Sequence, residues 1–232
     1  METDRLAALI ADLDHPDKPT IRAAVDQLIE LARESAQVRS ALDLRLNALG
    51  HRNYWPVAYI LGHLPRPSGA AIRKLLDTLD HREPDIRWAC SLLLAKIAQR
   101  ETAVIELLIE LCRHGTANQR RMAIYCLRDL EMKDAASLHA LIESLADSDA
   151  TVRVAAVTSL KNRTDDTERV RAALLQTYLT DTDIKVRNAA AVTLANFGSP
   201  SEAFLLALRK ATESDDGQAR KAAAIALGLL QK

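Results

Sequence analysis

Apolar residues recur along this chain at intervals of three and four residues, with little of the strict alternation typical of strands. Within residues 164–179, for example, Val170 and Leu174 mark one apolar face, and a second amphipathic stretch covers residues 184–197. The Asp-Thr-Asp at 181–183 lies between them, and its carboxylates can cap the second helix by accepting free N–H groups. The pattern therefore predicts two helices joined by a short acidic turn.

The same pattern occurs seven times. Residues 147–160 read DSDATVRVAAVTSL and residues 181–194 read DTDIKVRNAAAVTL, and the same register fits stretches that begin at positions 16, 51, 81, 114 and 214. An arginine anchors six of the copies, while Val57 takes its place in the second. The anchors lie 30–35 residues apart, at positions 22, 57, 87, 120, 153, 187 and 220. A period this regular indicates a repeat architecture that fills the whole chain.

Each copy is read as two helices, so seven copies predict about fourteen helices in seven antiparallel pairs. We expect an all-α fold in which these pairs stack as an α-solenoid and form a single domain over residues 1–232. The expected repeats are residues 1–35, 36–66, 67–99, 100–132, 133–164, 165–198 and 199–232.

The core of the repeat, D-x-D-x-x-V-R-x-A-A-x-x-x-L, resembles HEAT repeats, in particular the short HEAT-like repeats also found in phycobilisome bilin lyases. The resemblance covers essentially the full chain and is strongest from residue 81 onward. It implies a right-handed α-solenoid, a superhelix of the armadillo or HEAT type. It is specific for the fold and says little about function, because such repeats serve many unrelated partners.

The arginines of the repeat have carboxylates nearby, either in the same turn or one repeat away. An arginine–carboxylate fork can tie adjacent repeats together, and in HEAT-like families an Asp and an Arg at these positions commonly form such a ladder. We therefore expect a structural ladder rather than a row of ligands for an anionic partner. Its expected members are Arg22, Arg87, Arg120, Arg153, Arg187, Arg220, Asp147, Asp149, Asp181 and Asp183.

Positions counted from the anchor arginine fall into two groups, one expected to pack in the core and one expected to face a partner. The alanines two and three places after it are expected where neighbouring second helices approach closely, and positions three, seven and ten are expected in the core. Positions one, five and eight form a stripe that should face the concave surface. There the copies stop being equivalent, and the aromatic and basic side chains gather in the middle of the chain.

The middle of the chain is therefore the predicted binding surface. Residues 50–130 hold twelve Lys and Arg against eight Asp and Glu, together with both tryptophans and three of the four tyrosines. Tryptophan, tyrosine and arginine are the residues enriched in interface hot spots, and they also suit stacking or cation–π contacts with a peptide or a planar ligand. The alternative for Trp55 and Tyr59 is that they fill space in the irregular second copy. The predicted partner-binding residues are Trp88, Arg121, Tyr125 and Arg128, with Trp55, Tyr59 and Lys161 at the margins.

Overall charge disfavours two classes of partner. The chain carries 31 basic and 31 acidic residues, so no positive field draws it to nucleic acid or to an anionic membrane. Its first residues carry acids where an export signal would carry a basic region, and its uncharged runs are too short to span a bilayer. Three cysteines without a CxxC pair fit a reducing compartment. We expect a cytoplasmic protein.

A search for chemistry finds few candidates. No histidine has a neighbour suited to a metal, no HExxH or CxxC is present, and the His-Glu pairs of iron-dependent HEAT-like hydroxylases are missing. His51 and His81 stand where later copies have the first Asp of the turn, so we interpret them as turn residues rather than as a catalytic pair. Neither Trp55 nor Trp88 is followed four residues later by an Asp, unlike the pattern of HEAT-like DNA glycosylases. No cofactor, metal or catalytic residue is predicted.

The sequence therefore predicts a non-enzymatic scaffold or adaptor that binds a protein or peptide on the concave face of its central repeats. One alternative is a subunit related to bilin lyases that handles a tetrapyrrole chromophore. A second is a HEAT-like DNA glycosylase or another nucleic-acid binder, which the neutral charge disfavours. The last helix is apolar on nearly all sides, although terminal repeats normally have a polar outer face. Contact with a partner or a second copy of the chain is expected there through Ile225, Leu229 and Leu230.

Overall fold

A computed structural model describes residues 2–48, 54–130, 134–163, 166–197 and 202–230 of the chain. Within these ranges it contains fourteen α-helices and three short 3-10 helices, and no strand. The helices alternate in antiparallel pairs, so the prediction of an all-α solenoid of paired helices is confirmed. His51 lies outside the described residues.

The first helices of the pairs carry odd numbers. They are α1 (Glu2–Asp12), α3 (Ala36–Asn47), α5 (Gly69–Thr78), α7 (Ala103–His114), α9 (Ala135–Glu143), α11 (Thr167–Thr180) and α13 (Glu202–Ala211). The second helices carry even numbers. They are α2 (Lys18–Glu34), α4 (Trp55–Gly62), α6 (Pro84–Ala98), α8 (Ala117–Arg128), α10 (Ala150–Ser159), α12 (Ile184–Leu194) and α14 (Gly217–Leu230). The 3-10 helices are η1 (Ser144–Ala146), η2 (Leu160–Asn162) and η3 (Ala195–Phe197).

A polar side chain caps the second helix in several of the pairs. Asp149 and Asp183 accept hydrogen bonds from the backbone N–H groups two residues on, and so satisfy donors that have no partner inside α10 and α12. Thr116 and Gln119 form a reciprocal capping box at the start of α8. The acidic turns seen in the sequence thus act first as helix start signals.

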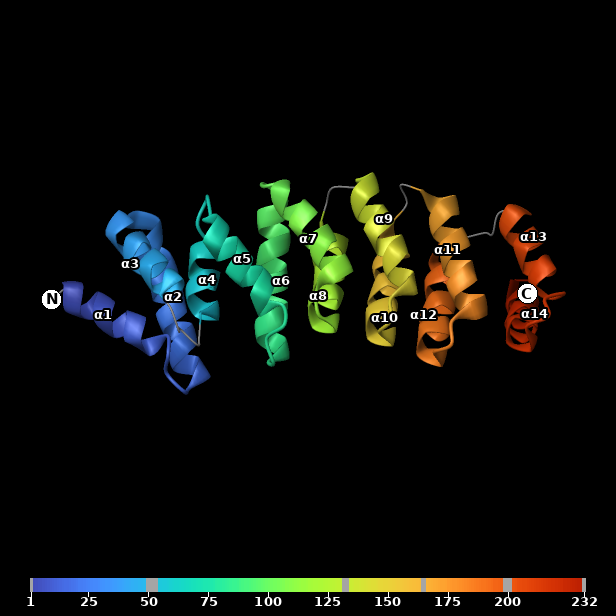
Figure 1. Ribbon diagram of the computed structural model, residues 1–232, viewed down its shortest axis with the longest axis horizontal. Helices are drawn as coiled ribbons and strands as arrows, with labels where there is room; N and C mark the ends of the chain where they lie inside the picture. The colour runs from blue at the N-terminus through green and yellow to red at the C-terminus, as the bar shows by residue number, and fades with distance from the viewer. Residues whose placement is uncertain (1, 49–53, 131–133, 164–165, 198–201, 231–232) are drawn as a thin grey trace. The chain divides into compact units, whose positions relative to one another are not determined.

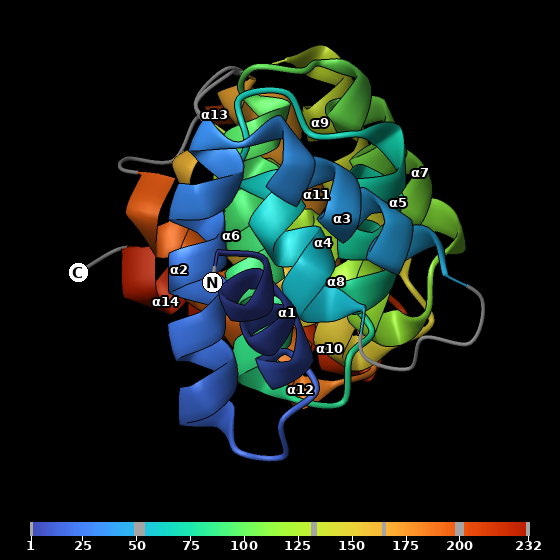
Figure 2. The same cartoon turned by 90° about the vertical axis from the view of Figure 1, so that its left-hand side faces the viewer.

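The chain divides into two compact units, residues 1–106 and residues 107–232. In the first unit α2 packs against α1, α3 and α4, and α4 packs against α5 and α6. Figure 2, which faces the N-terminal helices, shows α1 and α4 beside α2. In the second unit α10 packs against α8 and α12, and α11 against α12 and α14. Figure 1 shows the pairs α9–α10, α11–α12 and α13–α14 one after another.

Small and β-branched residues line the contacts of the second helices. The position three residues after an anchor arginine is buried in all six copies that have one. Its occupants are Val25, Cys90, Ala123, Ala156, Ala190 and Ala223. Alanine there leaves room for the backbones of adjacent second helices to approach, as the repeat pattern predicts. The leucine seven residues after the anchor is buried in three copies as well, as Leu94 in α6, Leu127 in α8 and Leu160 at the start of η2.

The second copy has a different register from the one expected. Val57 was assigned to the anchor position, but it is fully buried like the residue three places later in other copies. Tyr54 therefore takes the arginine's place, three residues earlier. With that change the first two intervals become 32 and 33 residues, in line with the rest.

Tyr54 contacts the next helix pair, as the anchor arginines Arg120 and Arg153 do. Its hydroxyl hydrogen-bonds with the side chain of Thr78 at the end of α5. The Lys74 ammonium, from the same helix, lies 4.7 Å from the centre of the Tyr54 ring. A hydroxyl and a cation–π contact thus stand in for an ion pair between the second and third copies.

A candidate interaction surface on the second helices

The stripe at positions one and five after the anchor is accessible, whereas the helix faces beside it are buried. In the first unit Trp88 and Leu92, both on α6, are 41% and 42% exposed. In the corrected register Trp55 and Tyr59 on α4 occupy the same two positions, and both are half-buried. Ala95, expected in the stripe, is buried instead. These four side chains form what we call the first-unit face.

Residues of α2, α4 and α6 line a cavity of about 250 Å³. Its ten lining residues are Lys18, Ile21, Arg22, Val25, Asp26, Trp55, Tyr59, Asp85, Ile86 and Ala89. Helix α4 has eight residues, against seventeen for α2 and fifteen for α6. Its two neighbours meet directly through ion pairs of Lys18 with Glu83 and Asp85. Trp55 and Tyr59 both line this cavity.

Some charged side chains around this cavity have ion-pair partners among the described residues, and one has none. Lys18 contacts Glu83, and its ammonium lies 3.1 Å from the Asp85 carboxylate. The hydrogen bonds that Lys18 donates to these two acids hold its pKa above the usual value. Arg22 lies 3.5 Å from the same Asp85 and its side chain is 70% exposed. Asp26 lines the cavity without a hydrogen-bond or ion-pair partner among the described residues.

The second unit carries a basic and aromatic cluster on α8. The Arg128 guanidinium lies 4.8 Å from the centre of the Tyr125 ring and donates two hydrogen bonds to Asp129. Arg121 donates to the Asn118 side chain at 3.2 Å. All three predicted residues are half-buried and occupy one face of the helix, which we call the second-unit face. The predicted marginal residue Lys161 lies in η2 and is exposed.

Three apolar residues of the stripe are exposed, and two of them, Leu92 and Val192, are not among the predicted binding residues. Leu92, Val192 and Ile225 stand five residues after their anchors and are 42%, 67% and 52% exposed. Their repeat position could have identified them, since each occupies the same position as Tyr125. An aliphatic residue on a helix, however, is usually assigned to the core. Ile225 had been named as a contact of the last helix. The side chains of Leu229 and Leu230 lie outside the described residues.

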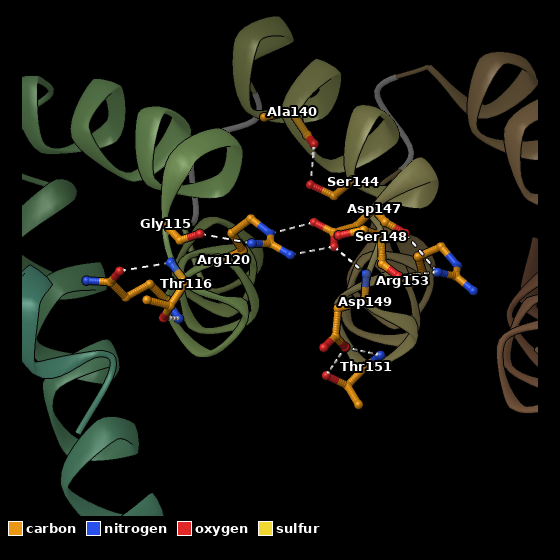
Figure 3. Close-up of polar contacts among 11 residues, drawn as sticks. Gly115, Thr116, Arg120, Ala140, Ser144, Asp147, Ser148, Asp149, Thr151 and Arg153 are labelled. Carbon is orange, nitrogen blue, oxygen red and sulfur yellow. Dashed lines mark hydrogen bonds and ion pairs between the residues drawn. The ribbon is translucent and has the colours of Figure 1, made fainter. Parts of the chain in front are cut away.

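Two rungs of the expected ladder form in the second unit. The Nε and Nη2 atoms of Arg120 donate to Asp147 at 2.7 and 2.8 Å, and those of Arg153 donate to Asp181 at 2.7 and 2.9 Å. Figure 3 shows Arg120 between the Gly115 carbonyl, to which its Nη1 donates, and the Asp147 carboxylate. Each arginine therefore joins the turn before its own helix to the turn of the next repeat.

The carboxylates of these rungs are largely shielded from water. The side chains of Asp147 and Asp181 are 8% and 6% exposed. Burial opposes ionisation of Asp181, but the hydrogen bonds from Arg153 and from the Asp183 N–H outweigh it and hold its pKa below the usual value. Charge-assisted forks of this geometry are among the stronger polar contacts in proteins.

The other predicted ladder residues make different contacts. Asp149 and Asp183 act as helix caps rather than rungs. Arg87, Arg187 and Arg220 donate through Nη1 to carbonyls of the turn before their own helix. The turn position that would face each of Arg87 and Arg187 from the next copy holds His114 and Ser214, neither of which is a carboxylate. Arg22 pairs with Asp85 at the cavity.

The interpretation of His81 as a turn residue agrees with its geometry. Its Nδ1 accepts a hydrogen bond from the Glu83 N–H at 3.1 Å, as the Asp147 carboxylate accepts one from the Asp149 N–H at 2.8 Å. His15 accepts from the Asp17 N–H in the same way. An imidazole in this position must be neutral to accept the bond.

This geometry predicts a pH-dependent contribution of His81 to stability. Burial lowers the pKa of His81 below its ordinary 6.5, with Arg82 and Arg87 acting in the same direction and Glu83 and Asp85 against it. The unfolded chain therefore takes up the proton first, so the contribution is complete above pH 6.5 and is lost as the pH falls through the lowered folded value. It amounts to at most about 1 kcal/mol, the value of one hydrogen bond.

Urea unfolding of wild type and His81→Asn, followed by circular dichroism between pH 7.5 and pH 5, measures this contribution. The asparagine oxygen accepts the same bond at every pH, so the variant should lose less stability than wild type over this range. Equal losses in the two proteins would show that the turn hydrogen bond does not titrate.

The described residues offer little for covalent or metal chemistry. Burial raises the pKa of the Cys90 and Cys112 thiols to about 12, which leaves them protonated and inaccessible at neutral pH. No group of three or more His, Cys, Asp and Glu side chains within the described ranges is placed to hold a metal ion. No helix in the described part of the chain is both long and apolar enough to cross a bilayer.

Comparison with known proteins points to one type of repeat. The family model for HEAT repeats matches residues 72–161 and residues 138–228. No curated protein matches the chain. The chain is similar to the solved structure of the Escherichia coli protein YibA, with a TM-score of 0.54 and 15% identity over 97% of this chain and 92% of that chain.

Engineered repeat proteins are also among the similar structures. One engineered protein has a TM-score of 0.44 and 20% identity over 98% of this chain and 96% of its own. A computationally designed armadillo repeat protein for modular peptide recognition has a TM-score of 0.43 and 14% identity over 83% of this chain and all of its own. At these identities the likeness concerns the fold alone.

Proposed function

Because the chain belongs to the HEAT-repeat family, a repeat fold typical of protein-interaction scaffolds, we propose that it is a non-enzymatic module that binds a partner polypeptide along its second helices. Stacked repeats present a long row of equivalent helix faces, and side chains on that row are free to vary once the framework positions are satisfied. The proposed binding residues are those of the first-unit face in the first unit and, in the second unit, those of the second-unit face together with Val192 and Ile225.

One observation carries this proposal. The position three residues after the anchor is buried in every copy, while the neighbouring stripe leaves large apolar side chains accessible. Single exposed apolar residues are normal on any surface, but here they recur at one repeat position on α6, α12 and α14. Recurrence at one position supports a role in recognition rather than chance exposure.

Trp88 and Tyr125 are the proposed anchors of the bound polypeptide. Aromatic side chains supply large contact area at low conformational cost, and a few of them usually dominate the affinity of an interface. Arg121 and Arg128 flank Tyr125 and can donate to carboxylates or carbonyls of the partner, because a guanidinium has five donors and each makes only some of its contacts within the chain.

Replacing Trp88 and Tyr125 with alanine should weaken partner binding while leaving the fold intact. We expect each substitution to reduce affinity about tenfold to a hundredfold, the range of interface hot spots. Capture of partners from the source cell with wild type and with the double variant, followed by titration of the captured polypeptide, measures the effect.

Leu44→Ala and Leu206→Ala provide a matched control. Both residues are large, apolar and exposed, at 76% and 66%, but they lie on the first helices α3 and α13. The control variants should retain the partner. If Trp88→Ala with Tyr125→Ala retains it equally well and circular dichroism is unchanged, the second helices are not the binding surface.

Neither of the other functions considered from the sequence gains support. The cavity of about 250 Å³ on the first unit is below the roughly 300–1,000 Å³ typical of small-molecule sites. Two larger hollows in the second unit, of about 460 and 370 Å³, are shallow and more open to solvent. With a formal net charge of zero, the chain also lacks the basic excess on which nucleic-acid binding depends.

A further inference from the structure

The cavity between α2, α4 and α6 has features that the proposed peptide binding does not by itself require. From its aromatic floor and its unpaired carboxylate we propose that it is a socket for one arginine side chain of the bound polypeptide. This inference rests on the proposed function and specifies one chemical group of the partner.

The floor of the cavity consists of two aromatic side chains that also carry polar groups. Trp55 and Tyr59, one turn apart on α4, both line it. Neither the Trp55 Nε1–H nor the Tyr59 hydroxyl has a hydrogen-bond partner among the described residues. Trp55 meets the His81 ring edge-on, with ring centres 6.5 Å apart. Electron-rich ring faces attract cations, and tryptophan does so most strongly.

The charge balance of the cavity favours a cation over an anion. The Lys18 ammonium is held by Glu83 and Asp85, and Arg22 shares the Asp85 carboxylate. Asp26, one turn after Arg22 on α2, is left without a counter-ion among the described residues. Burial raises the pKa of Tyr59, and Cys90 and Asp26 act in the same direction.

A guanidinium fits this arrangement better than an ammonium does. It is planar, so it can stack on an aromatic ring while its edge donates two parallel hydrogen bonds to one carboxylate. Ile21, Val25 and Ile86 supply apolar walls along which the methylene groups of an arginine side chain can pack. A volume of about 250 Å³ suits a single long side chain rather than a drug-sized ligand.

The origin of the socket can be followed to the sequence of the second copy. Tyr54 takes the place of the anchor arginine in this copy and is not among the residues that line the cavity. Trp55 and Tyr59 follow it at the stripe positions, and the short α4 lets α2 and α6 form the walls. The irregularity of this copy is thus what creates the site.

Nuclear magnetic resonance titration of the full chain tests the inference. The two tryptophans give two indole N–H signals, which Trp55→Phe assigns, and Trp88 serves as an internal reference because it does not line the cavity. The probes are N-acetyl-arginine amide, its lysine and glutamate equivalents, and the citrulline equivalent, which has the shape of arginine without its charge.

We expect the arginine probe to shift the Trp55 signal saturably in the millimolar range, and to leave the Trp88 signal unchanged. The lysine probe should bind more weakly, and the citrulline and glutamate probes should not bind. Asp26→Asn should weaken arginine binding about tenfold, since it removes a charge-assisted hydrogen bond. Glu34→Gln, which removes an exposed carboxylate at the end of the same helix, should have no effect.

Several results would overturn the inference. They are an unresponsive Trp55 signal, equal binding of citrulline or lysine, preferential binding of glutamate through Arg22, or an Asp26→Asn variant that binds arginine as wild type does. Partner capture separates this inference from the broader proposal. If Trp88→Ala with Tyr125→Ala loses the partner but Asp26→Asn binds it with unchanged affinity, the interaction surface stands and the socket is not part of it.

Discussion

Replacing Asp181 with alanine is expected to lower the free energy of unfolding by about 3 kcal/mol, because it leaves a buried guanidinium without its counter-ion. Arg153 would lose the acceptor of two hydrogen bonds, and the Asp183 N–H would lose the acceptor of a third. The side chains of this pair are only 13% and 6% exposed, so water replaces the lost bonds poorly. Urea unfolding followed by circular dichroism measures the loss.

Ser214→Ala is the matched control for this prediction. Ser214 holds the same turn position one copy later and accepts the N–H of Asp216. Its substitution should cost at most about 1 kcal/mol, the value of one hydrogen bond. If Asp181→Ala costs no more than Ser214→Ala, the arginine–aspartate rungs do not tie the repeats together.

Replacing Ala156 with leucine should lower the free energy of unfolding by about 2–3 kcal/mol. Ala156 is fully buried three residues after the anchor Arg153, on a helix that packs against both α8 and α12. Three added carbons have no space there and must displace a neighbouring helix, and overpacking of this kind typically costs 1–3 kcal/mol.

Thr158→Leu, two residues further along the same helix, separates packing from helix propensity. Thr158 is exposed in the stripe and its hydroxyl bonds only to carbonyls of its own helix. Leucine there should change stability by less than about 0.5 kcal/mol, as exposed substitutions usually do. A comparable loss in both variants would mean that the framework and the stripe are not distinct faces.

The repeat pattern was sufficient to predict the fold because it determines both helices of each pair. The spacing of Arg120, Arg153 and Arg187, each followed by alanine and leucine at fixed distances, determines where a second helix begins and which face is buried. The predicted register was wrong only in the second copy, where a tyrosine replaces the anchor arginine. Tyr54 reaches the next pair by a hydroxyl and a ring instead of a guanidinium, which a search for Arg cannot detect.

The sequence predicted which residue types form a rung of the ladder, but not which copies form one. A rung needs an arginine in one copy and a carboxylate at the first turn position of the next, and only Asp147 and Asp181 meet this condition within the described residues. Asp149 and Asp183, two residues later, cap helices instead. Sequence alone does not separate the two carboxylates of one turn, because both are acidic and both precede the helix.

The candidate surface was predicted from its aromatic and basic members, and the structure adds members of other kinds. Leu92 and Val192 are accessible only because their repeat position faces away from the neighbouring helices. The cavity could not be predicted, since it depends on the lengths of α2, α4 and α6 and on an ion pair between residues 67 positions apart. Such contacts follow from packing, which the spacing of residues does not reveal.

Site-specific photo-crosslinking tests the proposed surface most directly. A photoreactive side chain is placed at Leu92 or Tyr125 on the second helices, and at Leu44 or Leu206 on the first helices, and the protein is irradiated with its captured partner. We predict that positions 92 and 125 crosslink to the same polypeptide while positions 44 and 206 do not. Crosslinks from the first helices, with none from the second, would contradict the account.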